Sequence, residues 1–146
     1  MKKAILALAA AALVMPAAQA QMGPAKHPAA DYYVVTMIDF EEGRAEAAHD
    51  LIHNYFAKAD EVTGGTGPDV VMNFITGEWD MMVAWKMKGG MADAEWAMSP
   101  DDARWFGGLV QVAGGEAQAM AKWEEWVSMI ARTSTHYAFS PDFSAP

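Results

Sequence analysis

Three residues near the start of an expected helix form the sharpest chemical pattern in the chain. Glu46, His49 and His53 follow one another at spacings of three and four residues, which places them within about 60° of arc on one flank of a helix. Histidines at i and i+4 can coordinate one metal ion, and a carboxylate one turn earlier can add a third ligand. This set would suit a divalent transition metal or haem. In the alternative interpretation, the histidines only line the boundary of an amphipathic helix.

A second group of polar residues falls on expected strands. Tyr33, Asn73 and His136 would be the few polar groups of an apolar pocket if their strand faces pointed into a barrel. A tyrosine or histidine in such a pocket could act as a general acid or base toward a phenolic substrate. Alternatively, Tyr33 and His136 are interface residues and Asn73 bonds the backbone at a sheet edge.

Composition excludes several other kinds of chemistry. The chain has no cysteine and a net charge of −9, so thiol catalysis is ruled out, and neither nucleic acid nor a membrane surface is an expected partner. The glycine-rich segment 64–67 lacks the lysine of a phosphate-binding loop. The twelve methionines and six tryptophans fall mostly among other apolar residues on element faces, where packing explains them.

The N-terminus carries an export signal. Lys2 and Lys3 precede an apolar run from Ile5 to Val14, and Ala18-Gln19-Ala20 offers the small-x-small pattern of a signal-peptidase site. We therefore expect residues 1–20 to be cleaved before Gln21, which gives a periplasmic or secreted protein.

The rest of the chain is expected to form one domain. The glycine, proline and serine content of the two flanks predicts a flexible lead-in over 21–30, a single domain over 31–140 and a disordered tail over 141–146. Apolar periodicity predicts strands and helices in the order βαββαβ, the split βαβ arrangement of a ferredoxin-like α+β fold with an antiparallel four-stranded sheet. Strands are expected over 31–40, 70–76, 79–87 and 133–139, and helices from Gly43 to about Asp60, from the Ser99-Pro100 start, and over 116–130, with helical turns over 91–98.

Finer features follow from individual residues. Gly77-Glu78 suits a two-residue type II′ turn between the middle strands. The inward faces of the last two helices are expected at Ala103, Phe106, Val110 and Ala113, and at Ala119, Met120, Trp123, Val127 and Ile130.

Three of the expected strands are apolar on both faces, so something must cover the side of the sheet that the helices leave bare. A second copy of the same sheet is the simplest cover, which predicts a homodimer with two sheets facing each other.

The element order, the Tyr32-Tyr33-Val34-Val35 strand and the Gly77-Glu78-Trp79-Asp80 hairpin resemble the dimeric α+β barrel superfamily. That superfamily includes antibiotic-biosynthesis monooxygenases and EthD-like, NIPSNAP-like and stress-responsive barrel proteins. The resemblance implies paired sheets around a pocket and, in several branches, oxidation of small aromatic or polyketide substrates or haem binding. Haem-degrading members use an asparagine, a tryptophan and a histidine; Asn73, Trp85 and His53 supply these types without matching position by position, so that activity is not carried over.

The sequence thus predicts an exported homodimeric barrel that binds a small apolar or aromatic molecule. The alternatives are a cofactor-independent or metal-assisted monooxygenase, and a metal- or haem-binding protein that uses the first-helix histidines.

Overall fold

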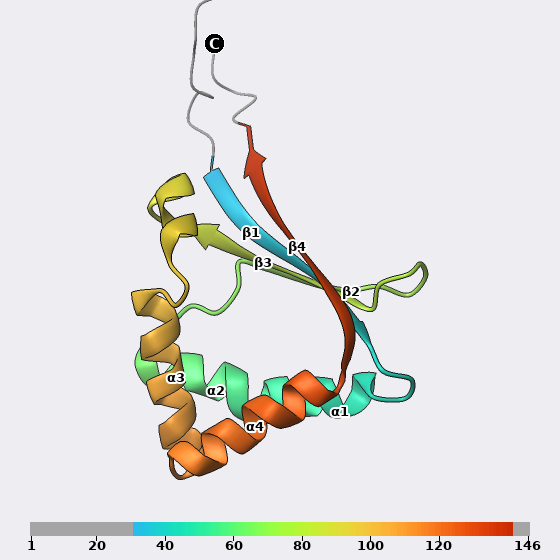
Figure 1. Cartoon of the computed structure of the whole chain (residues 1–146), viewed down its shortest axis with the longest axis vertical. Helices are drawn as coiled ribbons and strands as arrows, with labels where there is room; N and C mark the ends of the chain where they lie inside the picture. The colour runs from blue at the N-terminus through green and yellow to red at the C-terminus, as the bar shows by residue number, and fades with distance from the viewer. Residues whose placement is uncertain (1–30, 142–146) are drawn as a thin grey trace, which may run out of the picture.

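The computed structural model describes residues 31–141 (Figure 1). The signal peptide expected over 1–20, the lead-in over 21–30 and all of the expected tail except Pro141 lie outside the described residues.

The four strands form one antiparallel sheet. They are β1 (Asp31–Phe40), β2 (Val70–Asn73), β3 (Met81–Met87) and β4 (Ile130–Ser140), in the spatial order β2-β3-β1-β4. This order confirms the predicted ferredoxin-like α+β topology. β1 has the predicted bounds, and β4 begins earlier than expected because its ladder with β1 continues through a register shift between Asp39 and Phe40.

The predicted two-residue turn between β2 and β3 is wrong, because Asp80 hydrogen-bonds to the end of β1 and is not paired in the β2–β3 ladder. The Asp80 N–H donates to the carbonyl oxygen of Ile38 at 3.0 Å, and its carboxylate accepts the N–H of Phe40 at 2.8 Å. The β2–β3 connection therefore runs from Phe74 to Asp80 and closes with a hydrogen bond between these two residues. Asn73 consequently faces Met81.

The first helical segment comprises α1 (Ala45–Leu51), a π-helical turn η1 (Ile52–Phe56) and α2 (Ala57–Thr63). Its extent is close to the prediction. It ends at Gly64, whose φ of 66° is left-handed and suits glycine. The π-helical turn was not expected, since the apolar period alone does not distinguish it from an α-helix.

The second helical segment contains the 3₁₀ turn η2 (Gly90–Glu95), α3 (Pro100–Ala113) and α4 (Glu116–Ser128). The predicted helix start at Ser99 is confirmed as a capping box: the Ser99 hydroxyl accepts the N–H of Asp102 at 3.1 Å, and the Asp102 carboxylate accepts the N–H of Ser99 at 2.8 Å.

Two clusters of buried residues hold the molecule together. One joins the sheet to α1 and α4, and the other joins α2, α3 and α4 to one another. The first contains Ile38, Phe40, Ala48, Leu51, Met81, Val83, Trp126 and Met129; the second contains Ala59, Leu109 and Ala119.

The predicted inward faces of α3 and α4 are partly wrong. Ala103, Met120, Trp123 and Val127 are exposed, whereas Gly108, Leu109 and Trp126 are buried. The reason is that α3 packs on α2 at Gly108, where a Cβ atom would collide with the carbonyl oxygen of Ala59. α4 in turn directs Trp126 toward the sheet.

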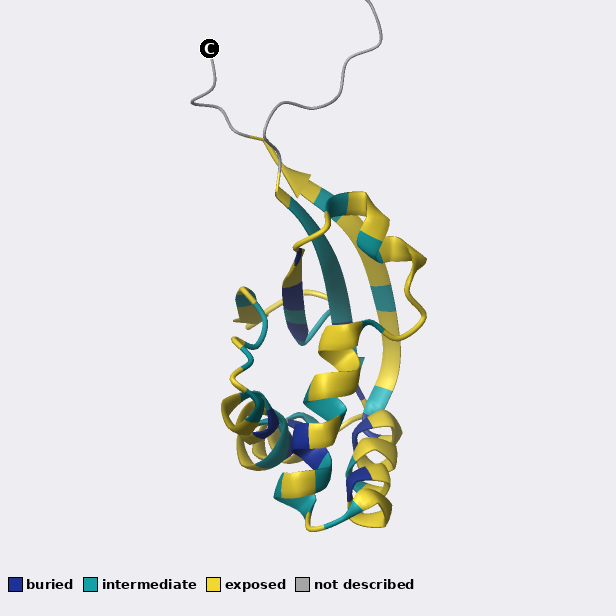
Figure 2. Cartoon of the chain, turned by 90° about the vertical axis from the view of Figure 1, so that its left-hand side faces the viewer, coloured by how far each residue is buried: buried dark blue, intermediate teal, exposed yellow. Residues whose placement is uncertain are grey.

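The helices lie on one side of the sheet (Figures 1 and 2). We call this the helix side; it includes Ile38 of β1 and Met81 of β3. Within residues 31–141 no helix covers the opposite face, which we call the bare side. Strand alternation places on it Asp31, Tyr33, Val35, Met37, Asp39, Val70, Met72, Met82, Ala84, Lys86, Arg132, Ser134, His136, Ala138 and Ser140.

Candidate functional site

The sheet register separates the three predicted pocket residues. Tyr33 and His136 lie on the bare side, where Tyr33 is diagonal to His136 across the β1–β4 ladder. Asn73 lies opposite Met81 and therefore on the helix side. His136 is exposed, and its Nε2 is 2.8 Å from the Ser134 hydroxyl. Tyr33, Asn73 and His136 thus do not converge on one reacting atom within this protomer.

His49 and Asn73, which the sequence placed in different candidate sites, meet in the structure. The Nε2 atom of His49 on α1 lies 3.1 Å from Oδ1 of Asn73 on β2. The His49 ring also stands edge-on to Phe40, with ring centroids 6.2 Å apart. This contact ties the short edge strand to the first helix.

The predicted metal ligands are not assembled into a site. Glu46, His49 and His53 are all exposed. In the described part of the chain, no three histidine, aspartate or glutamate side chains are grouped so that they could hold one metal ion. The metal and haem hypotheses therefore remain predictions from spacing alone.

A shallow pocket of polar side chains lies between the first helical segment and α4. It is lined by Asp50, Asn54, Tyr55, Lys122 and Glu125, together with Ala47 and Leu51. Lys122 already binds the Glu125 carboxylate at 2.7 Å and lies 4.7 Å from the centroid of the Tyr55 ring. Because its one cation is already paired, this pocket offers little to an incoming ligand.

A second candidate site lies on the helix side of the sheet, at the end that the α-helices do not cover. Tyr32, Trp85, Tyr137 and Phe139 form what we call the aromatic cluster. Trp85 is 42% exposed, Tyr137 56% and Phe139 42%, although Met81 on the same face is 2% exposed. Val34 lies between Trp85 and Tyr137 in the ladder, and the rings of Tyr32 and Phe139 have centroids 6.3 Å apart.

Further apolar residues border the aromatic cluster. η2 contacts β1 and β3, and Figure 2 shows it in front of the upper part of the sheet. On this turn and the segment that follows, Met91, Trp96 and Met98 are 47 to 64% exposed. The polar groups nearby on the helix side are hydroxyls, since Oγ1 of Thr36 and Oγ1 of Thr135 lie 3.4 Å apart.

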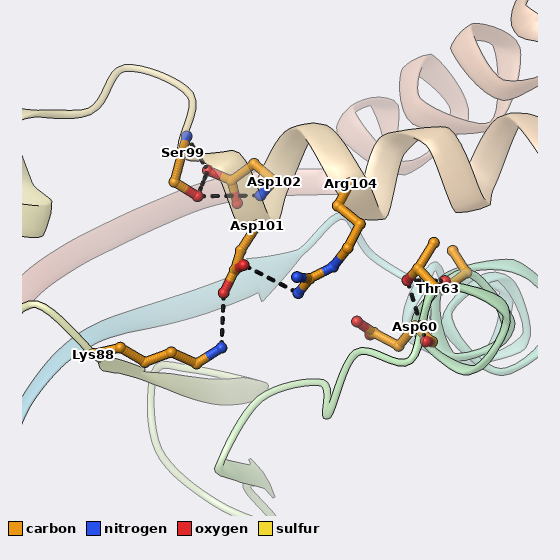
Figure 3. A network of polar contacts seen from close by, with 8 residues as sticks. Asp60, Thr63, Lys88, Ser99, Asp101, Asp102 and Arg104 are labelled. Carbon is orange, nitrogen blue, oxygen red and sulfur yellow. Dashed lines mark hydrogen bonds and ion pairs between the residues drawn. The ribbon is translucent and has the colours of Figure 1, made fainter.

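An exposed ion pair joins the start of α3 to the residue that follows β3 (Figure 3). Asp101 binds Lys88 at 2.8 Å and Arg104 at 3.0 Å. The hydrogen bond from Lys88 lowers the pKa of Asp101. Only the Lys88–Asp101 pair joins α3 to the chain after β3, because Arg104 lies within α3.

The sheet order and the one-sided helices define an α+β protein of ferredoxin-like topology. No family model and no curated protein match the sequence. Solved structures of NIPSNAP proteins do share the fold, in agreement with the predicted resemblance.

Three of these structures are similar over most of the chain. A NIPSNAP family protein of unknown function from Agrobacterium tumefaciens is 10% identical, with a TM-score of 0.53 over 78% of this chain and 91% of its own. A second one from that bacterium is 14% identical, with a TM-score of 0.51 over 78% and 89%. A NIPSNAP-like domain protein from Burkholderia xenovorans is 15% identical, with a TM-score of 0.50 over 80% and 90%. Identities this low show the fold alone.

The aromatic cluster was missed by sequence reasoning. Trp85 is two residues from Val83, and Tyr137 is two residues from Phe139, so the members of each pair share a strand face. The sequence does not show how far along the sheet the helices reach. Packing was therefore the expected role of the tryptophans, including Trp85.

Proposed function

We propose that the protein binds a small apolar or aromatic molecule at the aromatic cluster. The observation that carries this proposal is that Trp85 and Tyr137 remain about half exposed on the same sheet face that buries Ile38 and Met81. Covering the remaining area of such side chains yields on the order of 1 kcal/mol each, and ring stacking adds about 0.5–1.5 kcal/mol per pair.

The surroundings of the cluster favour an uncharged ligand. The helix-side positions of the three long strands around it carry apolar, aromatic or hydroxyl side chains and no formal charge: Tyr32, Val34, Thr36, Trp85, Met87, Thr135, Tyr137 and Phe139. The net charge of −9 also disfavours anions. Thr36, Thr135 and the Tyr137 hydroxyl supply hydrogen-bonding groups for one or two polar atoms.

Calorimetric titration with 2-naphthol, an uncharged planar aromatic probe, tests the proposal. We expect saturable binding with a negative heat-capacity change, because apolar surface is buried. Trp85→Ala should weaken binding by about 10-fold. Trp123→Ala is the matched control, since Trp123 is 41% exposed on α4, away from the cluster. Equal effects of the two variants, or no saturable binding by the wild type, would overturn the proposal.

We also propose that two copies associate through the bare side. This face carries Tyr33, Val35, Met37 and Met82 at its centre, all partly exposed in the protomer. Its charged residues are paired, because Lys86 binds Asp31 at 2.8 Å and Arg132 binds Asp39 at 2.9 Å.

Charge neutrality favours self-association on this face. The chain as a whole has a net charge of −9, so most of its surface repels a second copy. The bare side, with its internal ion pairs, does not. Sedimentation equilibrium should therefore give a dimer, and a monomer at every concentration would refute this part of the proposal.

Export to the periplasm or medium is the third part of the proposal, and it is supported by the signal-like residues 1–20. The exported protein should begin at Gln21 in N-terminal sequencing. Retention of Met1 in a cytoplasmic fraction would contradict it. In the described residues, no helix is long and apolar enough to cross a bilayer.

A further inference from the structure

The β2–β3 connection, Phe74–Asp80, forms an arm that presents apolar side chains to solvent. Ile75 at its tip is 99% exposed, and Phe74 is 39% exposed. Figure 1 shows the arm projecting from the sheet on the side away from the helices. The Ile75 side chain is almost fully exposed and so contributes no buried apolar area to the stability of the protomer. Such an exposed apolar tip is typical of a surface that binds a partner.

The base of the arm is held firmly while its tip is left uncovered. Arg132 of β4 donates from Nη2 to the carbonyl oxygen of Glu78 at 2.6 Å, and its guanidinium lies 4.4 Å from the centroid of the Trp79 ring. The same guanidinium binds Asp39 on β1. The N–H of Phe74 donates to the carbonyl oxygen of Asp80 at 2.8 Å. Because the base is already ordered, little further conformational entropy is lost when the tip meets a partner.

We infer that the arm contacts a second copy of this chain when the two copies associate through their bare sides. This inference rests on the dimer proposed above. The arm is continuous with that face, because Met72 of β2 belongs to the bare side and is 52% exposed. In a two-fold symmetric pair, each copy presents its own arm to the other. Phe74 and Ile75 would then cover one edge of the interface between the two sheets.

Charge favours a second copy over a membrane. The base of the arm carries Glu78, Asp80 and Asp39 against the single cation Arg132. An excess of acidic groups at the base of the arm opposes its approach to an anionic lipid surface. A neutral bare side on another copy imposes no such repulsion.

Sedimentation equilibrium of the purified full chain tests the inference with three variants. Ile75→Asp should raise the dimer dissociation constant by about 100-fold or more, because both copies lose the contact and gain a charge. Val127→Asp is the matched control: Val127 is 51% exposed on α4, away from the bare side, and dimerisation should be unchanged. Met37→Asp introduces a charge into the centre of the bare side and should also dissociate the dimer.

The possible outcomes distinguish the inference about the arm from the proposal that the protein forms a dimer. If Met37→Asp dissociates the dimer and Ile75→Asp does not, the arm inference is wrong and the paired-sheet proposal stands. A wild type that is monomeric throughout overturns both. If the wild type binds phosphatidylcholine–phosphatidylglycerol vesicles, and Ile75→Asp abolishes this while leaving self-association intact, the arm meets lipid and the inference fails. Far-ultraviolet circular dichroism checks the fold of each variant.

Discussion

Two adjacent glycines in α3 should respond in opposite directions to the same substitution. A Cβ atom at Gly108 would collide with the carbonyl oxygen of Ala59 and lie 2.7 Å from Cγ2 of Thr63. A Cβ atom at Gly107 would meet nothing within 4 Å. In both positions alanine raises helix propensity, which is worth about 0.5–1 kcal/mol.

The packing of α3 on α2 decides whether alanine raises or lowers the free energy of unfolding at each position. For Gly107→Ala the propensity gain stands alone, so the free energy of unfolding should rise by about 0.5–1 kcal/mol. For Gly108→Ala, the helices must separate or distort, and overpacking costs roughly 1–3 kcal/mol. Since the obstacle is backbone, we take the upper part of that range and expect a net loss of about 1–2 kcal/mol.

Urea denaturation of the two variants, followed by circular dichroism, measures the difference. The expected gap between them is about 2–3 kcal/mol, which corresponds to roughly 10 °C in melting temperature for a domain of this size. If Gly108→Ala is as stable as Gly107→Ala, α3 does not approach α2 at Gly108, and the helix–helix cluster around Leu109 is misplaced.

Three smaller predictions concern single polar groups. Burial raises the pKa of Asp60, and the hydrogen bond from the Gly67 N–H and the charge of Arg104 partly oppose this shift. Because the pKa is raised in the folded state, the free energy of unfolding falls as pH rises through it. Asp60→Asn should therefore be at least as stable as wild type at neutral pH and lose this advantage in acid titrations, at pH values where Asp60 is protonated in both states. Asp80→Ala removes the acceptor of the Phe40 N–H and should lower the free energy of unfolding by about 1–3 kcal/mol; a change near zero would show that water replaces the carboxylate. Ser99→Ala removes the hydroxyl cap of α3 and should cost about 1 kcal/mol, with Ser99→Thr restoring most of it in the same melting assay.

The fold could be predicted because its signals are local. β1 is apolar on both faces and stops before Gly43, and α3 begins at a serine, a proline and two acids. The β2–β3 register could not be predicted in the same way. It depends on Asp80, which bonds residues of β1 far away in sequence.

The surroundings of the candidate site residues could not be predicted for a related reason. The helical spacing of Glu46, His49 and His53 places them on one flank, but spacing does not say what faces that flank, and His49 meets Asn73. Strand alternation fixes which residues share a face only once the register is known. Without the register, Asn73 could not be separated from Tyr33 and His136.

The pairing of Asp31 with Ser140 has a mechanical consequence. The outermost residues of the domain sit side by side at one corner of the sheet, at the ends of two antiparallel neighbours. A force applied between them would open the β1–β4 ladder one pair at a time, as a zipper opens. It would not load all of its hydrogen bonds at once, as shearing between opposite ends of parallel strands does. The domain should therefore yield at low force when pulled by its two ends, whatever its resistance to heat or urea.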